Sequence, residues 1–202
     1  MISRIGRIAI FSGLLLGILP SRAQNAPVNP AEMIRIRSIE AETIASPKYS
    51  ADVRGESLSR DGRLDWLMVK VIYDTAPKWT DEITFTFYVV LKGKAEDLPR
   101  GANELNMFSE TVTIVNVPQV RNGETSVFLD PYTLARYGEP THVAVVVSIN
   151  GQSAGQFANP PLAANAPAGW WDRETPNQTP LLTRDKTPYA LIEIDKQNTI
   201  KP

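Results

Sequence analysis

Ser153 is the residue whose surroundings come nearest to a catalytic motif. It lies in Gly151-Gln152-Ser153-Ala154-Gly155, a G-x-S-x-G pattern that in α/β-hydrolases presents a serine on a turn between a strand and a helix. Asn159-Pro160-Pro161 follows where that helix would begin, and the one histidine, His142, precedes the serine instead of following it. We therefore expect a hairpin turn with a glycine at each rim. Serine hydrolysis through Ser153 is the least favoured hypothesis.

Other groups that could bind a metal or transfer protons are sparse. The chain has no cysteine, which excludes disulfides, thiolate metal sites and cysteine nucleophiles, and one imidazole makes a poor transition-metal site. The acidic pairs Asp81-Glu82 and Glu96-Asp97 offer the two carboxylates that glycoside hydrolysis requires. Neighbours on a strand point to opposite faces, so we interpret both pairs as solvated turns. We predict no catalytic residue, no metal site and no cofactor, and a protein that is not an enzyme.

Composition places the chain among ordinary folded proteins. Its 202 residues are 43% hydrophobic and 21% charged, which favours one globular domain with appendages. The 21 basic residues nearly balance the 22 acidic ones. Because phosphate binding needs clustered Lys and Arg, we predict no nucleic-acid partner.

The N-terminus has the plan of a secretory signal peptide. Arg4 and Arg7 precede an almost wholly apolar stretch from Ile8 to Leu19, and Ser21-Arg22-Ala23 provides the small residues of a cleavage site. The stretch is shorter than the roughly 20 residues that span a bilayer. We therefore predict that residues 1–23 form a cleaved signal peptide rather than an uncleaved anchor. We predict export to the periplasm, the outer-membrane surface or the extracellular space, with no membrane span in the mature chain. The lack of cysteine suits a bacterial envelope protein.

Strand signals follow one another from residue 33 onward. Alternating or β-branched runs predict strands over Met33–Thr43, Leu64–Asp74, Ile83–Leu91, Thr111–Val117, Thr125–Leu129, Thr141–Ile149 and Gln152–Phe157, and a last strand with Leu191, Ile192 and Ile194. The polar residues 46–63 predict a long loop or a frayed edge strand. Asn122-Gly123 and Asn150-Gly151 predict tight hairpin turns.

Residues 130–138 predict one short helix between strands, with an acidic cap, a proline at the first helical position and a closing glycine. Together these elements predict an all-β, immunoglobulin-like antiparallel β-sandwich over residues 24–158. A tyrosine often closes the corner before the penultimate strand of such a sandwich, and we assign this corner to Tyr132 and Tyr137, the latter through its hydroxyl. The predicted inward-facing core is Leu67, Val69, Val71, Phe85, Phe87, Val112, Ile114, Val143, Val145 and Val147.

The chain changes character after the predicted sandwich. Six prolines occur in the 30 residues between Asn159 and Pro188 with no hydrophobic period, so residues 159–202 are predicted to be a proline-rich C-terminal segment that packs on the sandwich or docks from it. Trp170 and Trp171 lie within this segment. They either fold back to cover an open sheet edge, or anchor a partner protein, or offer a platform on which sugars stack.

Three short segments carry a resemblance to a known group of proteins. They are Asp65-Trp66-Leu67, the helical segment 130–138, and Leu181-Leu182-Thr183-Arg184-Asp185-Lys186-Thr187-Pro188-Tyr189-Ala190, which follows the paired tryptophans. With these, the chain resembles exported immunoglobulin-like proteins encoded beside type IV pilus-type machinery in Verrucomicrobia. The resemblance implies a non-enzymatic accessory protein of the cell envelope that works by contacts with a pilus or secretion component or with the host-facing surface.

The favoured hypothesis is therefore an exported protein-binding module of a pilus-like or secretion-associated assembly. We expect it to be a monomer on its own and to bind its partner through a sheet edge and through Trp170, Trp171 and Tyr189 of the C-terminal segment. The alternative is a carbohydrate-binding module that uses Trp170, Trp171 or Trp79 to bind glycan. Sugar binding would change tryptophan fluorescence, whereas assembly predicts co-purifying envelope proteins and no affinity for sugars.

Overall fold

The computed structural model describes residues 29–47, 49–53, 56–60, 64–98, 100, 103–160, 169–172, 175–177, 179–192 and 199–201. The predicted signal peptide, residues 1–23, lies outside these ranges. Within them, no helix is long and apolar enough to cross a membrane.

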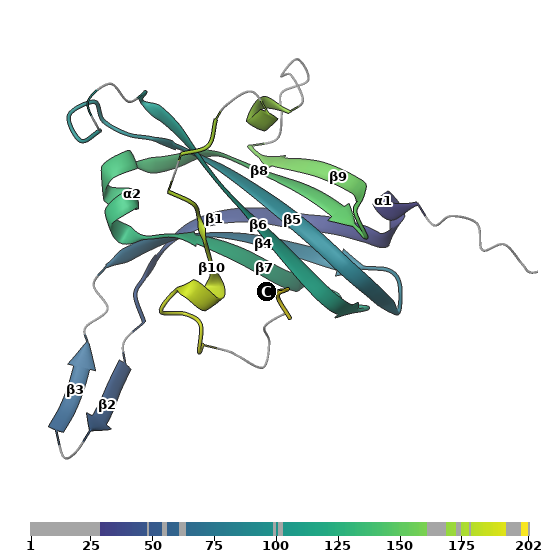
Figure 1. Cartoon of the computed structure of the whole chain (residues 1–202), viewed down its shortest axis with the longest axis horizontal. Helices are drawn as coiled ribbons and strands as arrows, with labels where there is room; N and C mark the ends of the chain where they lie inside the picture. Colours follow the sequence, from purple (N-terminus) through teal and green to yellow (C-terminus); the bar gives the residue numbers. More distant parts are fainter. Residues whose placement is uncertain are drawn as a thin grey trace, which may run out of the picture.

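Two antiparallel sheets of four strands pack face to face (Figure 1). The first sheet has the order β1 (Ile34–Ala45), β4 (Asp65–Thr75), β7 (Gly123–Leu129) and β10 (Leu182–Thr183). The second has the order β6 (Leu105–Pro118), β5 (Trp79–Lys92), β8 (Glu139–Ile149) and β9 (Gln152–Asn159). In the lettering of immunoglobulin domains these are strands A-B-E and C′-C-F-G, with β10 added beside E. The predicted immunoglobulin-like sandwich is confirmed.

The core lies between the sheets, where alternate residues of the central strands meet. All ten predicted core residues are at most 3% exposed. Tyr73, Phe85 and Phe108 fill the same space with aromatic rings, and Leu181 enters it from the C-terminal segment. Because the side chains of a strand alternate between faces, this burial also sets which residues lie on the outer faces of the sheets.

The predicted short helix is present as α2 (Pro131–Tyr137). The carboxylate of Asp130 accepts hydrogen bonds from the backbone N–H groups of Tyr132 and Thr133, at 3.0 and 3.1 Å, so it caps the first turn. Gly138 ends the helix with φ of +81°, and a Cβ at this position would lie 2.1 Å from the carbonyl oxygen of Lys92. Glycine is therefore required there by both conformation and space.

The two tyrosines assigned to the corner differ. Tyr137 is buried and its ring packs edge-on against Phe108 at 5.2 Å, so it contributes to the corner through this ring contact. A hydroxyl hydrogen bond from Tyr137 stays a prediction. Tyr132 is 75% exposed, so assigning it to the packed corner was wrong. Tyr132 is the second residue of α2 and lies on the solvent side of the helix. A helix this short has too few residues for the sequence to show which side faces the sandwich.

The turn at Asn122-Gly123 does not join a hairpin. Asn122 has the expected positive φ of 55°, but β6 and β7 belong to different sheets. The chain crosses between the layers, and β7 pairs with β4, placing Val127 opposite Val69. The prediction that the next strand returns beside β6 was wrong. In its sheet β6 pairs with β5 and is an edge strand, and β7 lies in the other sheet. By contrast, the predicted hairpin at Asn150-Gly151 joins β8 to β9.

Two further segments differ from the sequence-based expectations. Residues 46–63 contain a two-stranded hairpin, β2 (Tyr49–Val53) and β3 (Glu56–Arg60), which projects away from the sandwich (Figure 1). The predicted last strand is wrong: Leu191 and Ile192 lie in a turn and are 83% and 38% exposed, and Ile194 is outside the described residues. The C-terminal strand is instead β10, about ten residues earlier.

Candidate functional site

The described residues between 169 and 201, here called the C-terminal strap, wrap around one side of the sandwich (Figure 1). The strap begins with a short 3₁₀ helix, η1 (Trp170–Asp172), on the outer face of the second sheet. Trp171 is 2% exposed, and its ring stacks on Tyr88 of β5 with the centroids 6.1 Å apart. Burial raises the pKa of the Tyr88 phenol, with the nearby carboxylate of Asp172 adding to the effect.

The strap then bonds to the edge of β6. The N–H of Asn177 donates to the carbonyl of Met107 at 2.6 Å, and the N–H of Leu181 donates to the carbonyl of Ser109 at 3.3 Å. Farther along the same edge, Lys201 donates to Thr113 at 2.8 Å and Thr199 accepts from Val115 at 3.0 Å. These bonds satisfy four backbone groups along the outer edge of β6.

The strap also covers the edge of β7, in the other sheet. Leu182 and Thr183 form β10, and they pair with Phe128 and Val127. Since Leu181 bonds to β6 and Leu182 pairs with β7, the two edges lie on the same side of the sandwich. Unpaired sheet edges are templates on which other chains add strands. The strap therefore occupies part of this side, where another strand could otherwise add.

Tyr189 fixes the strap to the outer face of the first sheet. Its ring stacks on Phe128 at 5.2 Å and meets Trp66 edge-on at 6.0 Å, and its hydroxyl donates to the carbonyl of Ala45 at 2.8 Å. Burial raises the pKa of the Tyr189 phenol. The turn before it is held by Thr187, whose hydroxyl donates to the carbonyl of Arg184 at 2.7 Å.

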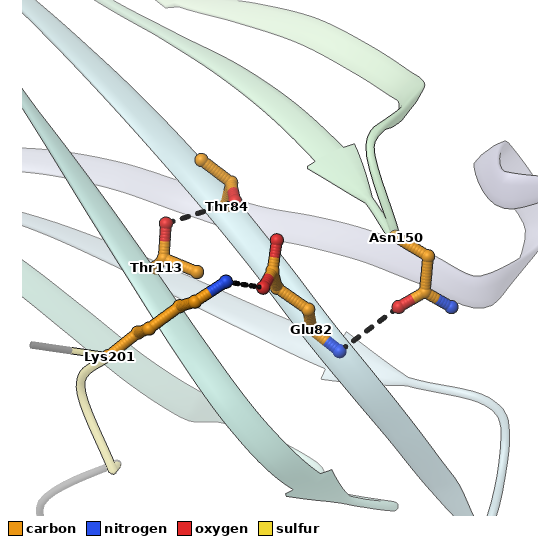
Figure 2. Close-up of polar contacts among 5 residues, drawn as sticks. All are labelled: Glu82, Thr84, Thr113, Asn150 and Lys201. Atoms are coloured by element: carbon orange, nitrogen blue, oxygen red, sulfur yellow. Dashed lines mark hydrogen bonds and ion pairs between the residues drawn. The ribbon is translucent and has the colours of Figure 1, made fainter.

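Figure 2 shows how the end of the strap is anchored. Lys201 reaches across β6 and pairs with the carboxylate of Glu82 on β5 at 2.6 Å. The backbone N–H of Glu82 donates to the side chain of Asn150, in the β8–β9 turn, at 3.1 Å. Beside this pair, the hydroxyls of Thr84 and Thr113 bond across β5 and β6 at 3.1 Å. Near its last described residues the strap is thus linked directly to two strands of the second sheet, β6 and β5.

The residues predicted to bind a partner are therefore occupied within the chain. Trp171 and Tyr189 are buried against opposite outer faces of the sandwich. Trp170 is half-buried, packs edge-on against Trp171 and His142, and has a buried indole N–H with no acceptor in the described structure. That these three residues contact a partner stays a prediction, and for Trp171 and Tyr189 it would require the strap to leave the sandwich.

The four tryptophans of the chain all fall within the described residues, and one of them is well exposed. Trp79, at the start of β5, is 62% exposed. Trp66 is buried beneath Tyr189 and donates its indole N–H to the hydroxyl of Ser46 at 3.0 Å. Of the three tryptophans predicted as a sugar-stacking platform, Trp79 offers the most exposed ring and Trp171 is buried.

The structure does not bring the groups of a hydrolase together. Ser153 is exposed on β9, opposite Ser148 of β8. His142 is opposite Val90 near the other end of β8, about 20 Å away at the rise of an extended strand. The described part of the chain also holds no group of three or more His, Asp or Glu side chains that could bind a metal ion.

These features define a class of protein: an immunoglobulin-like β-sandwich that covers part of two of its sheet edges with its own C-terminal strap. A protein-family model matches residues 26–202, and the chain belongs to the family that this model defines. A crystal structure of a protein from Akkermansia muciniphila matches with a TM-score of 0.66 and 20% sequence identity, over 84% of this chain and 93% of that chain. At this identity the likeness shows the shared fold. No curated protein matches the sequence.

Proposed function

We propose that the protein is a non-enzymatic, exported immunoglobulin-like module that acts by protein–protein contacts in a pilus-like or secretion-associated assembly of the cell envelope. Three findings support this function: the family match over residues 26–202, the shared fold with a protein of Akkermansia muciniphila, and the resemblance in sequence to verrucomicrobial proteins encoded beside pilus machinery. Export by a cleaved signal peptide over residues 1–23 is part of the same proposal.

The closure of the sheet edges is the observation that carries this proposal. The strap bonds to four backbone groups of β6 and pairs with two residues of β7. On the other side of the sandwich, the side-chain amide of Asn159 donates to the carbonyl of Ile39 on β1 at 2.8 Å. Covered edges keep the domain from pairing non-specifically with strands of other proteins, so binding depends on a specific surface. Exposed aromatic side chains such as Trp79 and Tyr132 suit such surfaces, since aromatic residues are enriched at the centres of interfaces.

Crosslinking of the mature protein in native envelopes, followed by mass spectrometry, tests this function. The variants are Trp79→Ala and Tyr132→Ala, whose exposed side chains can be removed without disturbing the core. We expect an envelope protein to crosslink to the wild type, and its yield to fall in at least one variant. If no envelope protein crosslinks to the wild type at any position, the assembly proposal fails.

Carbohydrate binding is the second candidate, favoured by the exposed indole of Trp79. It predicts that sugars change the tryptophan fluorescence of the wild type and that Trp79→Ala abolishes this change. Sugar-independent fluorescence, with crosslinking to an envelope protein, would exclude it.

A further inference from the structure

A groove of about 540 Å³ opens at the end of the sandwich opposite α2. It lies where α1 (Pro30–Met33) enters β1, where β4 ends, and where the chain crosses from β6 to β7. Ala76 donates its N–H to the carbonyl of Met33 at 3.0 Å, which joins the end of β4 to α1. Thr75 joins the end of β4 to the β6–β7 crossing, since its hydroxyl donates to the carbonyl of Pro118 and accepts from the N–H of Val120. The walls of the groove are therefore bonded to one another.

The carboxylates of the groove are already engaged. One oxygen of Asp74 accepts from Arg37 at 2.7 Å, and the other accepts from the backbone N–H of Asn122 at 3.0 Å. These bonds, chiefly the one from Arg37, hold the pKa of Asp74 below its usual value, so it stays charged and satisfied. Glu32, in the first turn of α1, accepts from the side chain of Asn29 at 3.4 Å.

The arginines of the groove are available. Arg35 and Arg121 are exposed, and across the part of the chain that the structure describes neither guanidinium forms an ion pair. Arg35 lies opposite Asp74 in the ladder, which places it at the groove wall and close enough for its charge to help lower the pKa of Asp74. A guanidinium presents a planar fork of donors that matches a carboxylate, so two exposed arginines without an ion-pair contact suit an anionic group.

Other features of the groove distinguish between classes of anionic partner. Met33, Ile34 and Val120 give it an apolar part, and Glu32 and Asp74 would repel a uniform polyanion such as a nucleic acid or a sulfated glycan. A polypeptide offers both isolated carboxylates and apolar side chains. Trp79 lies beside the groove, because it pairs with Pro118, the residue before the groove-lining Gln119. Tryptophan and arginine together are the residues that most often dominate protein interfaces.

We propose that this groove binds a segment of a partner protein that carries Asp or Glu beside apolar residues. Arg35 and Arg121 pair with its carboxylates, its apolar side chains contact Met33 and Val120, and Trp79 covers it from the side. This inference rests on the proposed function, because it assigns the surface through which the protein contacts its partner.

Site-specific photo-crosslinking in native envelopes tests it. A photoreactive amino acid replaces Gln119, which is exposed and lines the groove, in the full chain. The crosslinked peptide of the partner is sequenced by mass spectrometry, in the wild-type background and in Arg35→Glu/Arg121→Glu. Lys94→Glu/Arg100→Glu is the matched control, because it reverses two exposed charges between β5 and β6, outside the residues that line the groove. Far-UV circular dichroism and urea unfolding verify that each variant is folded.

The expected product is a partner segment that contains Asp or Glu, with a yield reduced about tenfold in Arg35→Glu/Arg121→Glu and unchanged in the control, as expected for the loss of a charge pair at an interface. Crosslinks that persist in the groove variant, or partner segments without carboxylates, overturn the inference. A product that contains polysaccharide instead of peptide also overturns it. If Gln119 gives no crosslink while other positions capture an envelope protein, the inference fails and the proposed function stands. If no position captures one, both fail.

Discussion

Replacement of Trp171 by alanine should destabilise the protein although this residue lies in the proline-rich C-terminal segment. Its side chain is 2% exposed and contacts Tyr88, Val90 and Met107 on the outer face of the second sheet. A buried aromatic side chain removes about 150–250 Å² from water, which at about 25 cal/mol/Å² gives an upper bound of about 4–6 kcal/mol. Because the strap can relax around the cavity, we expect Trp171→Ala to lower the free energy of unfolding by about 3 kcal/mol.

Trp79→Ala is the matched control, since it removes the same side chain from a position that is 62% exposed. It should change the free energy of unfolding by no more than about 0.5 kcal/mol. Urea unfolding of the mature protein measures both values. If the free energy of unfolding falls by about 2 kcal/mol per molar urea in both variants, a loss of about 3 kcal/mol lowers the unfolding midpoint by about 1.5 M. If Trp171→Ala costs less than about 1 kcal/mol and resembles the control, the packing of the strap on this sheet is refuted.

The other predictions concern single features of the fold. Asp130→Ala should cost about 1 kcal/mol in urea unfolding, because it removes the cap of α2, and Asp130→Asn should restore most of the loss. Gly138→Ala should cost at least about 2 kcal/mol in the same assay, since its φ is +81° and a Cβ meets the backbone of Lys92; an unchanged midpoint would contradict this geometry. Burial raises the pKa of Tyr189 above the ordinary value of 10.0, so its contribution to stability is complete below that pH and is lost as the pH rises through the raised value. Tyr189→Phe should flatten this alkaline decline in a pH series of unfolding measurements, and an equally steep decline would count against it. Ser153→Ala should leave fluorophosphonate labelling unchanged at the background level, whereas labelling that depends on Ser153 would revive the hydrolase hypothesis.

The sandwich itself was predictable because its signals are local. In β5, Phe85 and Phe87 alternate with Thr84 and Thr86, and a strand with one buried face must carry this period. The cap at Asp130 and the glycine at 138 act within one helical turn, so sequence alone identified α2. Residues that are close in sequence decide these features.

The pairing of the edges was not predictable, because distant residues decide it. The hydroxyl of Tyr189 bonds to Ala45, 144 residues earlier, and Leu182 pairs with Phe128. Nothing in a proline-rich segment of mixed polarity specifies those partners. They follow from which edges the completed sandwich leaves open. The turn at Asn122-Gly123 shows the same limit. Its own residues set its backbone conformation, but distant residues decide which sheet the next strand joins.

The candidate surface shows a related limit. The paired indoles drew attention to Trp170 and Trp171, but their burial depends on contacts with β5, β6 and β8. Arg35, Arg121 and Trp79 are far apart in sequence, and only the ends of β1 and β4 and the β6–β7 crossing bring them to one end of the sandwich. A scan for motifs cannot find such a surface, because no two of its members share a local pattern.

Hydrogen exchange of the mature protein tests the central claim most directly, namely that the C-terminal strap is part of the fold. The informative amides are those of Asn177, Leu181 and Val115, which join the strap to β6. We predict that they exchange far more slowly than unstructured peptide and that Trp171→Ala accelerates the exchange of Asn177 and Leu181. Exchange of all three at the rate of unstructured peptide would contradict it, because the strap would then be free and its tryptophans available to a partner.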